Sequence, residues 1–126
     1  MTFPVRRGYI YQVEDKILRL PPEDKRQVHI ERRPFLVFSG DVTNGDSTWP
    51  VVSGFPISSS TTYRTEFDVQ LGAGDGNLSK KGWVRIHAVQ PLLKTDLQDC
   101  TGKKLADTQL LQIEAQLFRF IGSLSM

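Results

Sequence analysis

Two consecutive arginines stand directly in front of an apolar run, and their chemistry could serve a function. Segment 32–40 reads Arg-Arg-Pro-Phe-Leu-Val-Phe-Ser-Gly, which predicts a short strand buried on both faces. A proline is tolerated at the first position of a strand and keeps the residue before it extended. Arg33 is therefore predicted at the mouth of a core strand, where its planar guanidinium could bind a phosphate or a carboxylate. A solvated arginine pair at a strand end is the alternative.

A run of hydroxyl side chains could supply further hydrogen-bond donors. Residues 58–62 read Ser-Ser-Ser-Thr-Thr and follow the predicted strand 49–57. Antiparallel pairing of this strand with the preceding one would bring Ser58 and Arg33 to the same end of the sheet. We expect both side chains to face solvent. Gly54, inside the strand, indicates a bulge or the close approach of another backbone.

Histidines are candidate acids and bases, because imidazole exchanges protons near neutral pH. His29 lies near the end of a long charged segment, 14–31, that is predicted to be a surface loop. His87 lies in the predicted strand 83–89, whose alternation places it with Arg85 on one face and apolar residues on the other. Most loop histidines are solvated and have no catalytic role, which is the alternative for His29. His29, His87 and Arg85 are therefore three competing candidates for proton transfer.

Other reactive residue types give no site. The glycine-rich turn 71–77 lacks the Gly-Lys-Ser/Thr of a nucleotide-binding loop. The single cysteine, Cys100, excludes an internal disulfide, and with His29 and His87 it lacks the close ligand spacing of a zinc site. A catalytic thiol is conceivable, but a lone cysteine in a polar loop is more often a bystander. We therefore expect neither a metal nor a cofactor.

The elements that must position these groups are short strands followed by one helix. Strands are predicted at 8–13, 32–38, 49–57, 63–70 and 83–89, with a further short one at 92–93 and a turn at 41–46. Apolar residues at helical spacing predict a helix that Asp107 caps and that runs to about Ile121, with Gly122 at its end. This order favours a mainly β fold with a C-terminal helix, a small β-barrel closed by that helix, in a single domain 1–126.

Composition narrows the class of partner. The chain has 126 residues, 39% of them hydrophobic, and a formal net charge of +2. Basic residues are in excess in 1–40 and 78–105 and acidic ones in 41–77, so the two basic segments could form a moderately basic face for a polyanion. Ordinary solvated surface charge is the alternative. No apolar stretch is long enough to cross a membrane and no signal peptide is visible, so a cytoplasmic protein is expected.

Four motifs, taken in order, resemble the MazF/PemK/Kid family of toxin endoribonucleases. They are the opening Arg-Gly-Tyr-Ile-Tyr at 7–11, Arg33-Pro34 entering a core strand, Phe-Pro-Ile-Ser-Ser at 55–59, and Gly-Lys-Lys-Leu at 102–105 before a helix that ends in Ile-Gly. The resemblance covers about residues 7–122. It implies an SH3-like barrel that forms a homodimer, cuts single-stranded RNA at short sequences without a metal, and is silenced by an acidic antitoxin protein.

The resemblance also implies roles for single residues. The arginine before proline corresponds to Arg33 and the hydroxyl at the end of the next strand to Ser58. Two usual motifs are absent: Gly-Ser-Glu-Gln is replaced by Lys-Arg-Gln-Val-His at 25–29, and His87 or Val89 takes the position of the aspartate in Asp-Gln. The catalytic candidates are thus Arg33, Ser58, His29 and His87, and the candidates for RNA contact are Arg32, Ser59, Lys80, Lys81, Trp83 and Arg85.

Two other classes of function remain open from the sequence. One is a barrel of the same fold that binds RNA without cutting it or inhibits a protein target such as DNA gyrase. The other is an interaction domain whose basic face binds an acidic peptide. In the gyrase-poison branch of the fold the terminal helix would carry the function.

Overall fold

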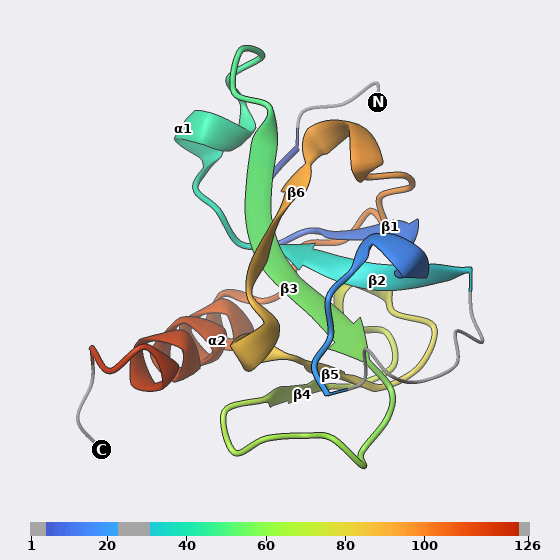
Figure 1. Cartoon of the computed structure of the whole chain (residues 1–126), viewed down its shortest axis with the longest axis vertical. Helices are drawn as coiled ribbons and strands as arrows, with labels where there is room; N and C mark the ends of the chain where they lie inside the picture. Colours follow the sequence, from blue (N-terminus) through green and yellow to red (C-terminus); the bar gives the residue numbers. More distant parts are fainter. Residues whose placement is uncertain (1–4, 23–30, 124–126) are drawn as a thin grey trace.

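The computed structural model describes residues 5–22 and 31–123, which form one antiparallel sheet with a long C-terminal helix (Figure 1). The six strands of this part of the chain are β1 (Ile10–Glu14), β2 (Arg32–Val37), β3 (Val51–Ser58), β4 (Val69–Leu71), β5 (Gly82–Val84) and β6 (Gln90–Leu93). Its α-helices are α1 (Asp41–Asn44) and α2 (Asp107–Phe120). Short 3-10 turns are η1 (Asp15–Ile17), η3 (Asp75–Asn77), η4 (Ile86–Ala88) and η5 (Lys94–Asp96).

Strand β3 is the central element and pairs with three others along its length (Figure 1). Its first half pairs with β6 and its middle with β2, while Ile57 and Ser58 at its end pair with β5. Gly54 lies between Val37 and Gln90, and a Cβ at this position would overlap the backbone carbonyl of Leu36. The expected close approach of another backbone is thus confirmed.

The sheet runs in the order β1-β2-β3-β5-β4, with β6 beside β3, and is not closed. The free edge of β1 is bonded to segment 98–101 rather than to β4, since Gln12 donates to Asp99 and Thr101 donates to Ile10, at 2.8 and 2.9 Å. The mainly β architecture with a C-terminal helix is confirmed. Closure into a barrel, which the sequence also suggested, is not confirmed.

Apolar residues pack on both faces of the sheet, so the molecule has two core clusters. On one face α2 packs through Leu110 and Ile113 against a cluster that includes Leu36 and Phe55. On the opposite face Phe35 belongs to a second cluster, which the chain after β1 covers with Leu18. Arg33 is two residues before Phe35 on β2, so its side chain projects to the same face as Phe35, the face of the second cluster.

Several local expectations differ from the structure. The predicted strand 63–70 is reduced to β4, and the predicted strand 83–89 ends at Val84 and continues as the turn η4. Residues 41–44 form a short helix inside the expected turn. Helix α2 has Ala106 rather than Asp107 as its N-cap, and the Ala106 N–H donates to the Gln109 side chain at 3.0 Å.

Other expectations are confirmed. The short strand at 92–93 is part of β6, and Gly122 follows α2 with a φ of 84°, the left-handed conformation typical of helix ends. The predicted loop 14–31 is described only in part, because residues 23–30 lie outside the described residues. No helix in the described ranges is long and apolar enough to cross a membrane.

Candidate active site

The carboxyl end of β3 is where the predicted phosphate-binding residues meet. Phe35 pairs with Pro56, and the same antiparallel register continued by two residues places Arg33 level with Ser58. Ser58 pairs with Trp83 on β5, and Trp83 pairs with Gln70 on β4. Paired residues project to the same face of a sheet, so these four side chains form one row across β2, β3, β5 and β4. The expectation that Arg33 and Ser58 lie at the same end is confirmed.

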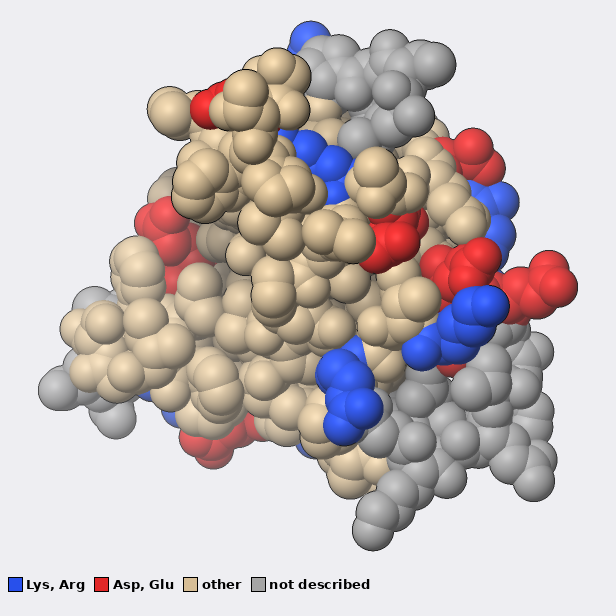
Figure 2. Space-filling view, turned by 45° about the horizontal axis from the view of Figure 1, so that its top comes forward, with Lys and Arg blue, Asp and Glu red and all other residues tan. Residues whose placement is uncertain are grey.

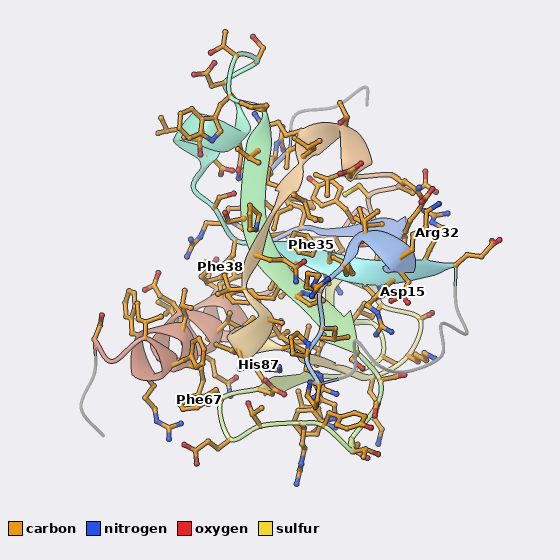
Figure 3. All side chains as sticks on the ribbon, viewed as in Figure 1. Asp15, Arg32, Phe35, Phe38, Phe67 and His87 are labelled. Atoms are coloured by element: carbon orange, nitrogen blue, oxygen red, sulfur yellow. The ribbon has the colours of Figure 1, made fainter. Side chains whose placement is uncertain are left out.

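Arg33 is not solvent-facing, contrary to expectation, because only 7% of it is exposed. Its Nε donates to Asp15 Oδ1 at 2.6 Å, and its Nη1 donates to the Ile57 carbonyl at 3.3 Å. Figure 3 shows Asp15 just beyond β1, where η1 begins next to the start of β2. A buried guanidinium requires a carboxylate partner, and η1 supplies one. Within the described ranges its Nη2 makes no hydrogen bond, so this is the group left for a ligand.

Ser58 is also buried rather than solvent-facing, with 2% exposed. Its Oγ accepts a hydrogen bond from the Ser60 N–H at 3.2 Å. This contact turns the chain at the end of β3 and fixes the hydroxyl within the row that also contains Arg33. The next residue, Ser59, is exposed.

Arg85 forms a second buried ion pair, which the sequence did not predict. Its side chain is fully buried, and its Nη1 donates to Asp68 Oδ2 at 2.8 Å. Its Nη2 donates to the carbonyl of Ser60, and Asp68 Oδ1 accepts the backbone N–H of Ile86 at 3.2 Å. The predicted strand 83–89, whose alternation would set Arg85 beside His87 on one face, is therefore wrong at this residue. Strand β5 ends at Val84, and the guanidinium of Arg85 is buried against Asp68 just before η4.

Asp68 is the functional-site residue that sequence reasoning missed. The available signal was a charged residue between Phe67 and Val69 in a predicted strand, since an acidic residue on an apolar face needs a cationic partner. The partner lies 17 positions away, so no local pattern identifies it. The same carboxylate also lies 3.9 Å from Nδ1 of His87.

His87 contacts two oxygens from different parts of the chain. Its Nε2 lies 2.6 Å from the carbonyl of Pro21, a contact in which the ring nitrogen donates, and its Nδ1 faces Asp68. In Figure 3 His87 lies apart from Asp15, the partner of Arg33. The described contacts of His87 include neither Arg33 nor Ser58. The other histidine candidate, His29, lies outside the described residues.

The remaining predicted RNA contacts fall into two places. Arg32 points away from the row, and its Nη2 pairs with Asp99 Oδ2 at 2.6 Å beside a polar pocket. Lys80 and Lys81 are exposed and lead into Trp83. The guanidinium of Arg64 lies over the half-buried ring of Trp83, with Cζ 4.9 Å from the ring centroid.

Charge is distributed more evenly than the sequence segments suggested. In the view of Figure 2 basic and acidic side chains lie interspersed on a mostly uncharged surface. Several arginines of the basic segments are neutralised, since Arg7 pairs with Glu114 and Arg32 with Asp99. Among the described residues, no group of three or more His, Cys, Asp or Glu side chains is arranged to hold a metal ion.

These observations define a class: a mainly β domain whose Arg-Pro strand and hydroxyl-ended strand meet at one end of an open sheet. The sequence matches the family described as PemK-like, MazF-like toxin of type II toxin-antitoxin system over residues 6–121. The chain therefore belongs to the PemK/MazF-like toxin family. Members of this family are known as endoribonucleases.

Solved structures agree in fold. An endoribonuclease from Mycobacterial species superimposes with a TM-score of 0.68 at 21% identity, over 95% of this chain and 93% of that one. MazF from Deinococcus radiodurans gives 0.67 at 20% identity, over 95% and 98%. A Mycobacterial endoribonuclease in complex with its cognate antitoxin gives 0.66 at 19%, over 97% and 96%. Among curated proteins, no sequence matches the chain significantly.

Proposed function

We propose that this chain is the toxin of a type II toxin-antitoxin pair and a metal-independent endoribonuclease of single-stranded RNA. The observation that carries the proposal is the juxtaposition of Arg33 and Ser58 at one end of the sheet in a chain of this family. A guanidinium and a hydroxyl side by side are suited to bind the non-bridging oxygens of one phosphate.

The proposed reaction uses the nucleophile that RNA itself carries. A base removes the proton of a 2′-hydroxyl, the 2′-oxygen attacks the adjacent phosphorus, and the 5′-oxygen leaves with a proton, which gives a 2′,3′-cyclic phosphate. Asp15 and the Ile57 carbonyl hold Arg33, so its Nη2 would meet the charge that develops on the phosphate. Ser58 would supply a second donor.

Proton transfer is assigned to a histidine rather than to Arg85. An arginine side chain stays protonated and cannot act as a base, and both Nη atoms of Arg85 are already bound, to Asp68 and to the Ser60 carbonyl. His87 is partly exposed, with its Nδ1 facing Asp68, and His29 stays a candidate from the sequence. Substituting each histidine by glutamine and recording the pH dependence of cleavage would distinguish them, because loss of the base removes one limb of the profile.

Cleavage of RNA in EDTA is the direct test. The parent protein should cut a long single-stranded RNA at a few short sequences and leave 2′,3′-cyclic phosphate ends. Arg33→Lys keeps the charge but loses the planar guanidinium with its several N–H donors, and we expect roughly tenfold to hundredfold slower cleavage. The loss for Ser58→Ala should be smaller. Ser53→Ala is the matched control, because Ser53 is exposed on the same strand but far from its end. Cleavage that requires a divalent metal, or no cleavage at all, contradicts the proposal.

A non-catalytic member of the fold would give a different result. Helix α2 exposes Leu111 at 65% and its C-cap residue Ile121 at 57%, which would suit a protein target such as DNA gyrase. In that case RNA would stay intact in every assay, and gyrase activity would fall on addition of the protein. Substituting Leu111 by glutamate would relieve that inhibition, whereas Ser58→Ala would not.

An antitoxin is the partner that the solved relatives suggest. One similar structure is an endoribonuclease with its cognate antitoxin, and another is a MazE-MazF pair from Deinococcus radiodurans. We propose an acidic antitoxin segment that binds over the same site, where Lys80 and Lys81 are exposed. Charge reversal at these two lysines should weaken that complex. Unchanged affinity would place the antitoxin elsewhere.

A homodimer is the proposed assembly. Val42 of α1, Trp49 and Leu93 are exposed at 90%, 48% and 50%, and Lys94 joins β6 to α1 through the Thr43 carbonyl at 2.8 Å. A second copy would cover this apolar surface. Sedimentation at tens of micromolar should give twice the monomer mass, and Leu93→Asp should shift the equilibrium toward monomer. A parent protein that sediments only as monomer contradicts this assembly.

A further inference from the structure

The indole of Trp83 lies directly beside the proposed phosphate site. Trp83 pairs with Ser58 across β3 and β5, so the two backbones are one strand spacing, ~4.8 Å, apart and the two side chains project from the same face. The ring is half-buried, and the exposed Arg64 lies over it with Cζ 4.9 Å from the centroid. A flat aromatic and a flat guanidinium are thus layered at the surface next to the reacting group.

The charges around this stack are cationic. Arg64, Lys80 and Lys81 are exposed, and none forms an ion pair with a carboxylate of the described residues. The acidic residues that follow Arg64 are engaged elsewhere, since Glu66 pairs with Arg119 at 3.3 Å and Asp68 with Arg85. A layered aromatic and cationic surface without competing carboxylates matches a ligand that is both flat and anionic, as a nucleotide is.

Gln70 completes the surface on the other side of the ring. It pairs with Trp83 across β4 and β5, and its side chain is exposed. A primary amide offers both donors and an acceptor, so it can read the edge of a base that lies on the stack. Stacking alone accepts any base, whereas an adjacent amide introduces a preference.

We propose that Arg64 and Trp83 form a stacking subsite for one nucleobase, adjacent to the phosphate bound by Arg33 and Ser58, and that Gln70 selects among bases there. The subsite deepens the proposed function and rests on it for the identity of the strand. Loss of one stacked base weakens binding by roughly 5- to 150-fold.

Fluorescence of Trp83 provides a direct readout. The chain has two tryptophans, so Trp49→Phe leaves Trp83 as the only one. A single-stranded DNA oligonucleotide of mixed sequence, which lacks the 2′-hydroxyl and is not cut, should quench this emission as it binds. Inorganic polyphosphate, which carries charge without bases, should not. Equal quenching by both, or binding of DNA without quenching, overturns the subsite.

Variants test the two layers separately. Arg64→Ala should fold normally, because Arg64 is exposed, and should bind the oligonucleotide at least fivefold more weakly. Trp83→Leu should weaken binding by a similar or larger factor, and Trp83→Phe, which keeps an aromatic face, should restore most of it. Gln70→Leu should change the preferred base at one position of the cut sequences with little change in overall rate. Affinity unchanged in both Arg64→Ala and Trp83→Leu overturns the subsite.

The outcome is separable from that of the proposed function. An RNA-cutting parent whose Trp83→Leu and Arg64→Ala variants keep the same affinity and cut sequences refutes the subsite and leaves the nuclease intact. A parent that never cuts RNA but whose Trp83 emission is quenched by DNA refutes the nuclease and leaves the subsite.

Discussion

Replacement of Arg33 by alanine tests the buried ion pair at the mouth of β2. Arg33 is 7% exposed and its partner Asp15 1%, with 2.6 Å between Arg33 Nε and Asp15 Oδ1. Removing one member of a buried pair leaves the other charge without its counter-ion and costs about 3–5 kcal/mol. For a chain of this length about 1 kcal/mol corresponds to roughly 3–4 °C in Tm, so the melting temperature should fall by about 10–20 °C.

A double-mutant cycle isolates the pair. The free energies of unfolding of Arg33→Ala, Asp15→Asn and the double variant are measured in urea. We expect the sum of the losses in the two single variants to exceed the loss in the double variant by about 1 kcal/mol or more. Arg32→Ala is the matched control on the neighbouring residue. Its partner Asp99 is largely exposed, so that pair should contribute less than about 1 kcal/mol.

The sequence alone led to the opposite expectation, that Arg33 is solvent-facing and can be replaced with little change in melting temperature. Equal small losses for Arg33→Ala and Arg32→Ala, with no coupling to Asp15, would refute the buried pair. Arg33→Ala that melts normally but no longer cuts RNA would restore the sequence-based interpretation of a purely functional arginine.

Three further perturbations follow from the packing. Burial raises the pKa of Tyr11 from 10.0 to about 12. The neutral phenol therefore contributes fully to the free energy of unfolding below pH 10, and this contribution falls by about 2.7 kcal/mol as the pH rises to 12. Urea titrations of the parent at several pH values should show this decrease, and Tyr11→Phe should remove it. Gly54→Ala should cost about 2–3 kcal/mol or more because its Cβ meets the Leu36 carbonyl, whereas Gly40→Ala, with no neighbour within 4 Å, should stay within about 0.5 kcal/mol. Asp68→Asn should destabilise by about 3 kcal/mol in a melt, and a loss below about 1 kcal/mol would mean that its pair with the guanidinium is dispensable.

Local patterns were sufficient for the elements that pack by periodicity. The apolar run of β2 predicts a strand buried on both faces, and the spacing of Leu110 and Ile113 predicts which face of α2 is buried, in both cases without reference to distant residues. The turn chemistry and the order of strands then place Arg33 and Ser58 at one end. Here hydrophobic alternation and connection length decide the outcome, and both can be read along the chain.

The same reasoning failed where a charge is satisfied by a distant partner. Alternation at 83–89 predicts a regular strand, but the structure turns at Arg85 because its guanidinium binds Asp68. Arg33 looked exposed for the same reason, since its carboxylate is 18 positions away. From the sequence, an arginine on a strand is assigned to the surface because it is charged. Only the tertiary fold shows that it forms an ion pair with a buried carboxylate.

The two ion pairs together explain how a short strand end can hold a reactive hydroxyl in place. Arg33 bonds the carbonyl before Ser58, at Ile57, and Arg85 bonds the carbonyl two residues after it, at Ser60. The N–H of Ser60 in turn donates to Ser58 Oγ. Each guanidinium is anchored by a carboxylate from a segment outside β3, so the serine is fixed from both sides by groups that themselves are buried. Rigidity at this position therefore depends on four charged side chains in addition to the pairing of Ser58 with Trp83 in the sheet.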